Sequence, residues 1–292
     1  MPNCVTHFLH AKQVLNQLPE ELTRTLNKNA YFWAAQGPDF LFCHRYLPFM
    51  KGASIQSYGS QLHKAKPSDI FRAMRSYVKQ YPKDPIARSY ALGFVNHYAL
   101  DSICHPYIKA LAKELRKEHM DQDLTALHAE VESSLDTIML RRETGKLPSQ
   151  IKLNHFFPKD EPVQREISKI YSFLIERLFD TVVKESVLYQ STKDTRIVFS
   201  LLTDSTGLKR KLISKIESGR PKYLTGHIIP LVEDAEIDFS NISGFVWTKE
   251  NGEESKKSFF ELFDEAQNQA KRIIVQYETC DFSVLTGEIP MG

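Results

Sequence analysis

Histidine and acidic residues that recur every four positions within apolar sequence constrain the fold of this 292-residue chain most. His97, Asp101 and His105 follow one another at this spacing, and His128 and Glu132 form a second pair. Residues four apart lie on the same face of a helix, so each set forms a polar stripe. The pattern predicts two helices that bring imidazole and carboxylate groups together if they pack against each other.

Helical patterns also dominate the rest of the chain, which predicts an all-α, multi-helix bundle. Asp84 and Pro85 are a good cap and first-turn pair for the helix that carries His97, and Pro106 is expected to end that helix near His105. Further helices are expected at 19–33, 67–81, 124–140, 162–190, 194–217 and 257–279, and irregular segments at 51–62 and 220–256.

A break between residues 145 and 158, rich in Gly, Pro and polar residues, is the best candidate boundary. We therefore expect a metal-binding helical core at 1–148 and a mostly helical extension at 149–292, which can also pack with the core as one domain. The extension carries no catalytic signal of its own.

Composition excludes several classes of protein. The 38 Lys and Arg residues nearly balance the 36 Asp and Glu residues, so no global charge points to nucleic acid or an anionic membrane. The first residues lack a basic and apolar leader, and no apolar run approaches the roughly 20 residues that span a bilayer. The four cysteines are scattered, as free thiols in a reducing compartment would be. These observations predict a cytoplasmic protein without a transmembrane segment.

Eight of the ten histidines lie at or before His128, a bias that packing alone does not explain. Imidazole and carboxylate are the ligands that zinc prefers. His97 and His105 are about 12 Å apart along a helix at 1.5 Å per residue, too far to share one ion. The stripe therefore predicts more than one metal ion, with Asp101 placed to bridge ions.

Simpler interpretations exist for single members of this set. One histidine four residues from an acid is usually an ion pair, but two such pairs with a third histidine in register favour a metal site. His10 can substitute for His7 as a ligand, although a helix-face position is the simpler interpretation. Cys104 could add a soft ligand but points about 100° away from His105. Four histidines lack comparable partners and are treated as ordinary: His44, His119, His155 and His227.

Other helical metal chemistries fit less well. The di-iron bundles use Glu-x-x-His pairs and the zincins use His-Glu-x-x-His, and the sequence contains neither motif. An adjacent His-Asp pair, which marks another family of helical phosphohydrolases, is also absent.

The ordered set of motifs over roughly residues 1–145 resembles the zinc-dependent phospholipase C family, in the branch that includes the amino-terminal domain of glycosylphosphatidylinositol-specific phospholipase D. The pieces that carry the resemblance are Thr6-His7, Gly37-Pro38-Asp39-Phe40, His63 before a helix, His97-x-x-x-Asp101, His105 and His128-x-x-x-Glu132.

The resemblance implies two or three zinc ions in a cleft. It assigns the first ion to Asp39, His63, His97 and Asp101, the second to His105, His128 and Glu132, and a third to His7 with Asp101. Asp39 would orient or deprotonate the attacking water. Secreted relatives also use the mature amino terminus as a ligand, whereas this chain starts six residues before His7, so the third site is expected to be the weakest.

These features predict a zinc-dependent phosphodiester hydrolase that acts on a phospholipid head group. Trp33 and Phe40, near Asp39, could receive a choline group by cation-π contact. The first alternative is a zinc nuclease for single strands, for which the basic residues between 209 and 222 would be a contact surface. The second is a helical protein that keeps the metal for structure or for binding without catalysis.

Overall fold

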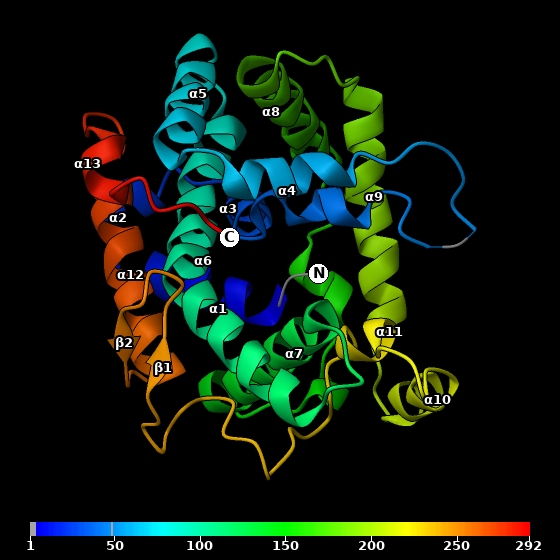
Figure 1. The fold of residues 1–292 in the computed structure, drawn as a ribbon. Coiled ribbons are helices and arrows are strands. Elements are labelled where there is room, and N and C mark those ends of the chain that lie inside the picture. Colours follow the sequence, from blue (N-terminus) through cyan, green and yellow to red (C-terminus); the bar gives the residue numbers. More distant parts are fainter. Residues whose placement is uncertain (1–3, 48) are drawn as a thin grey trace.

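The computed structural model describes residues 4–47 and 49–292, and within them helices surround one long central helix (Figure 1). The first half contains α1 (Cys4–Gln17), α2 (Glu20–Thr23), α3 (Lys28–Ala34), the 3-10 helix η1 (Gly37–Cys43), α4 (Gln56–Lys64), α5 (Pro67–Gln80), α6 (Pro85–Glu118) and α7 (Leu124–Thr144). The second half contains η2 (Pro148–Gln150), η3 (Leu153–Phe156), α8 (Glu161–Phe179), α9 (Glu185–Leu202), α10 (Leu208–Ile216), α11 (Tyr223–Gly226), β1 (Trp247–Thr248), β2 (Glu254–Ser255), α12 (Phe259–Val275) and α13 (Phe282–Thr286).

Helix α6, 34 residues long, is the axis of the fold and packs against α1, α3, α7 and α12. It begins as predicted, because the Asp84 side chain accepts a hydrogen bond from the backbone N–H of Ile86. Gly93 lets α3 cross closely, since a Cβ atom there would lie 2.3 Å from the carbonyl oxygen of Tyr31. The all-α prediction is therefore confirmed, and the stripe His97–Asp101–His105 lies on one continuous helix.

The expectation that Pro106 ends this helix is wrong, because α6 continues to Glu118. Proline costs the helix one backbone hydrogen bond and a steric clash. Beyond it, Tyr107, Ile108 and Leu111 are buried in the core, and this packing holds the helix together. His105 consequently keeps its register with Asp101.

Other expected boundaries also differ from the structure. Segment 162–190 is divided between α8 and α9, because α8 ends at Phe179 with Asp180 in the left-handed conformation. Segment 51–62 contains most of α4, so His63 lies in the last turn of that helix as well as just before α5. Segment 194–217 is divided between α9 and α10 at a loop that Asp204 caps through the N–H groups of Thr206 and Gly207. Segment 19–33 is divided between α2 and α3, because Asn27 caps a new helix there. In these segments, local caps and turns move the ends of the helices, whereas the hydrophobic pattern of the sequence does not mark those ends.

The two halves of the chain share one hydrophobic core. Helix α12 packs on α6 and α1, and η1 packs on α9. The last residues return to the centre of the molecule, where the hydroxyl of Tyr98 donates to the carbonyl oxygens of Thr286 and Ile289. Among the described residues, no helix is both long and apolar enough to cross a membrane.

Candidate metal centre

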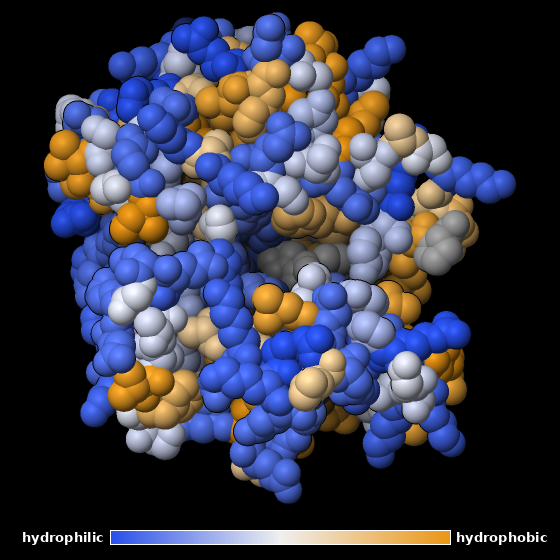
Figure 2. Space-filling view, in the orientation of Figure 1, coloured by the Kyte–Doolittle hydropathy of each residue, from blue (hydrophilic) through white to orange (hydrophobic). Residues whose placement is uncertain are grey.

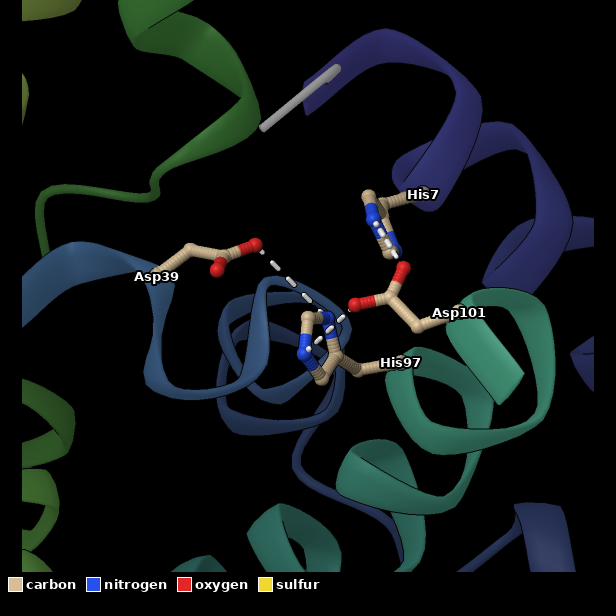
Figure 3. A group of neighbouring side chains, drawn as sticks. All are labelled: His7, Asp39, His97 and Asp101. Carbon is tan, nitrogen blue, oxygen red and sulfur yellow. Dashed lines mark ion pairs between the residues drawn. The ribbon is translucent and has the colours of Figure 1, made fainter. Parts of the chain in front are cut away.

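Four predicted ligands from three elements meet at the middle of α6 (Figure 3). His7 comes from α1, Asp39 from η1, and His97 and Asp101 from adjacent turns of α6. One ligand atom from each lies within 4.8 Å of the others, and all four side chains are buried. This group has two imidazoles and two carboxylates, the donor types that zinc uses.

A second group lies one turn further along α6 and contains His105 with His128 and Glu132 of α7. The Oε1 atom of Glu132 lies 3.1 Å from Nε2 of His128 and 3.5 Å from Nε2 of His105. The sequence-based expectation that the two helices bring their pairs together therefore agrees with the geometry.

The Asp101 carboxylate lies between the two groups. Its Oδ1 atom is 3.1 Å from Nε2 of His7 and 3.8 Å from Nε2 of His105, and its Oδ2 atom is 3.2 Å from Nε2 of His97. Its two oxygens thus face ligands of both groups, as a bridging carboxylate must.

The division of ligands differs from the one that the resemblance implied. His7 belongs to the same group as Asp39, His97 and Asp101, instead of forming a separate site. His63 lies at the edge of this group, with Nε2 3.1 Å from Oδ1 of Asp39 and 3.6 Å from Oδ2 of Asp101. Helix α1 packs on both α6 and α7, which carries His7 deeper than a spacing argument could show.

Several buried atoms of these side chains have no hydrogen-bond partner among the described residues. They are Nδ1 of His7, Oδ2 of Asp39 and both ring nitrogens of His97. Leaving a buried polar group unpaired costs about 1 to 3 kcal/mol. A cation coordinated by the carboxylate oxygen and by the unprotonated nitrogen of each imidazole would reduce that cost, so the residues fit a metal site.

Charge at the centre supports the same conclusion. Burial acts to lower the pKa of His63, but hydrogen bonds and charge from Asp101 and Asp39 raise it to about 10. Burial likewise opposes the rise at His105, where Asp101 and Glu132 bring the pKa to about 9. The carboxylates therefore stabilise the protonated, positively charged form of these imidazoles. A bound metal ion would supply that positive charge in place of the protons.

Two of the histidines are oriented by backbone carbonyl groups. Nδ1 of His63 lies 2.8 Å from the carbonyl oxygen of Gly59, and Nδ1 of His105 lies 2.7 Å from that of Met291. A carbonyl only accepts, so each Nδ1 carries the proton and each Nε2 faces the carboxylates. Such outer partners orient metal ligands and strengthen them. Sequence reasoning missed Met291, which is 186 positions away from His105.

Asp136 is a further positioning residue that the sequence did not reveal. This buried carboxylate on α7 accepts hydrogen bonds from the backbone N–H groups of Val5 and Thr6, at 3.1 and 2.7 Å, and from the Thr6 hydroxyl. Free N–H groups at a helix start attract an acceptor and negative charge. Asp136 thereby fixes the first turn of α1, which carries His7.

Gly37 makes room for the ring of His97. A Cβ atom at this position would lie 2.0 Å from Cδ2 of His97, and its φ of +50° favours glycine. The Gly-Pro-Asp sequence thus supplies both a candidate ligand, Asp39, and the space for a second one, His97.

The structure corrects the interpretation of Trp33 and Phe40. Both are 1% exposed, and neither borders the cleft. The Trp33 indole donates to the carbonyl of Pro158, and Phe40 packs edge-on against Tyr171. Their ring faces are occupied by the core, so neither can receive a head group there. His10 is also buried outside both groups, against Phe263.

A cleft of about 270 Å³ opens over the two groups, and Figure 2 shows this face hollowed near its centre. Its rim adds Phe42, Ser60, Lys64 and Lys109, which sequence reasoning did not identify. A second cavity of about 590 Å³ adjoins it and shares Asp101, His105, Lys109 and Gly292. The lysines supply positive charge beside the predicted ligands.

Fold and site together define a helical protein with two neighbouring groups of His, Asp and Glu side chains that could hold metal. Residues 6–188 match the sequence profile of the family described as zinc dependent phospholipase C, and the chain belongs to this family. The match extends beyond residue 145, where the resemblance seen in the sequence ended. Searches among curated proteins and among solved structures found no match.

Proposed function

We propose that the protein is a metal-dependent phosphodiester hydrolase of the phospholipase C type, with zinc bound at a cluster of two or three ions. The observation that carries this proposal is the Asp101 carboxylate, which contacts histidines of both ligand groups at the floor of one cleft. Family membership supports the zinc and a phospholipid-type substrate.

We assign one ion to the group of His7, Asp39, His97 and Asp101 and another to the group of His105, His128 and Glu132. His63 borders the first group and would complete it or help to hold a third ion. Zinc supplies positive charge for phosphate oxygens and makes water more acidic. The amino terminus, which secreted relatives use as a further ligand, lies outside the described residues here.

The side chains around the ions have separate tasks in this proposal. Asp39 borders the cleft, and its carboxylate would orient or deprotonate the attacking water. Lys64 and Lys109 on the rim would bind the phosphate through charge and hydrogen bonds. The adjoining cavity would receive a substrate group on one side of the phosphate.

A substrate panel tests this function. The protein should hydrolyse p-nitrophenyl phosphorylcholine or bis-p-nitrophenyl phosphate, lose the activity with a chelator, and regain it with zinc. Asp39→Asn should abolish turnover, whereas Asp194→Asn, the same change at a buried carboxylate outside the centre, should not.

Other outcomes identify the alternatives. Preference for single-stranded DNA over phosphorylcholine would favour a nuclease. Metal binding that stabilises the fold without hydrolysis of any substrate would contradict the proposal and favour a structural or binding role.

A further inference from the structure

Helix α10 (Leu208–Ile216) carries an apolar stripe that faces solvent. Leu208 is 67% exposed, Leu212 61% and Ile216 70%, and they follow one another at four-residue spacing. Residues at this spacing form one face of a helix. A surface helix of a globular protein normally turns such a face toward the core.

The opposite side of α10 attaches the helix firmly to the protein. The Arg210 guanidinium donates to the carbonyl oxygens of Thr225 and Ile228 and lies 3.2 Å from the carboxylate of Glu130 on α7. Asp204 accepts the backbone N–H of Arg210 at 2.8 Å, at the start of the helix. These contacts fix the orientation of α10 on the protein, so the apolar stripe on its opposite face points to solvent.

Positive charge surrounds the stripe. Residues 208–222 contain six basic residues and one acidic residue, Glu217. The Glu217 carboxylate is occupied, because it accepts hydrogen bonds from the backbone N–H groups of Leu224 and Thr225. At 100° per residue, Lys211 and Lys215 flank the stripe on one side. Figure 2 shows apolar and hydrophilic residues side by side at the corner that α10 occupies in Figure 1.

We propose that α10 is an interfacial helix that docks the protein onto an anionic phospholipid bilayer. Its apolar stripe would enter the boundary between head groups and acyl chains, and its lysines would meet the lipid phosphates, as in other helices that lie in the membrane surface. A second copy of the chain is a poor occupant, since a symmetric contact would bring the same positive charges together.

The attachment of α10 also relates the bilayer to the metal centre. Glu130, the partner of Arg210, lies on α7 between the ligands His128 and Glu132. A bilayer that binds α10 would therefore be connected, through the contact between Arg210 and Glu130, to helix α7, which carries part of the second ligand group. The inference goes beyond the proposed function, because binding to a bilayer requires no hydrolysis.

Sedimentation of the full-length, zinc-loaded protein with vesicles tests the inference. We expect stronger binding to phosphatidylcholine mixed with phosphatidylserine than to phosphatidylcholine alone, and weaker binding as salt rises. The triple variant Leu208→Ser, Leu212→Ser and Ile216→Ser should lower the partition coefficient about a hundredfold. Lys211→Gln and Lys215→Gln should each lower it about fivefold, on the anionic vesicles only.

Val275→Ser and Val284→Ser are matched controls, since both valines are exposed, 53% and 75%, but lie on α12 and α13. These variants should bind vesicles as the natural chain does. Circular dichroism and zinc content establish that each variant is folded.

Unchanged vesicle binding by the triple variant would overturn the inference. So would a shift from dimer to monomer in that variant without loss of vesicle binding, because the stripe would then be a contact between copies. Asp39→Asn separates the two proposals: it should abolish hydrolysis and leave vesicle binding unchanged, so either proposal can fail alone.

Discussion

Replacing Asp101 by Asn should remove metal from both ligand groups while leaving the fold intact. The change keeps the shape of the side chain and removes its charge between His7, His97 and His105. Asp101 lies 3.8 Å or less from candidate ligands of both groups, and a unit positive charge about 4 Å from a carboxylate is attracted by about 4 kcal/mol at an effective dielectric constant of ~20. Since 1.4 kcal/mol is a factor of ten, the affinity of each ion should fall about a thousandfold.

Competition titration with a chromophoric zinc chelator measures these affinities, and circular dichroism measures the helix content. Asp194→Asn is the matched control, because Asp194 is 2% exposed and lies outside the metal centre. The control should keep its zinc affinity and lose only stability. Normal affinity at both sites in Asp101→Asn would refute a bridging role for this carboxylate.

Four further predictions concern the candidate ligands and their surroundings. Gly37→Ala should lower the melting temperature and the zinc affinity, because the added Cβ atom collides with His97. Gly145→Ala is the control, since Gly145 also has a positive φ but has no neighbour within 4 Å. It should lose only about 1 to 2 kcal/mol of stability to backbone strain and keep its zinc affinity. Zinc binding at pH 7.5 should release protons from His63 and His105, as measured by calorimetry in buffers of different ionisation enthalpy. No release would contradict the raised pKa values. Because these folded-state pKa values of about 10 and about 9 lie above that of unfolded histidine, their contribution to metal-free stability should be complete below about pH 6.5 and be lost as pH rises through 9 to 10. Lys109→Met should raise KM for an anionic phosphodiester with little change in kcat, and an unchanged KM would remove this lysine from phosphate binding.

Ligands that share a helix were predictable from sequence, because helix geometry fixes which residues share a face. His97, Asp101 and His105 needed only the four-residue period, and the same holds for His128 and Glu132. The separation of His97 and His105 into different groups followed from the helical rise per residue.

Contacts between distant segments were not predictable in the same way. The grouping of His7 with Asp39 depends on how α1 packs, and no spacing in the sequence encodes that arrangement. The carbonyl of Met291 contacts the candidate ligand His105, and the carboxylate of Asp136 holds the first turn of α1 beside His7, each more than a hundred positions away in sequence. A backbone carbonyl has no residue-type signal at all, so only the folded chain reveals this kind of partner.

Local rules also failed where tertiary packing outweighed them. Pro106 lies inside α6 because buried residues on its far side hold the helix together. Trp33 and Phe40 are close to Asp39 in sequence, yet their rings are in the core, because η1 turns the side chains of Asp39 and Phe42 toward the cleft and that of Phe40 away from it. Proximity in sequence therefore identified the right segment but the wrong aromatic residues, and Phe42 is the aromatic residue that borders the cleft.

The zinc content of the protein, purified without chelators and then titrated with zinc, tests the central claim most directly. Two ligand groups joined by Asp101 predict at least two tightly bound ions per chain, measured by elemental analysis against protein concentration. Less than one equivalent before titration, with no uptake when zinc is added, would contradict the account.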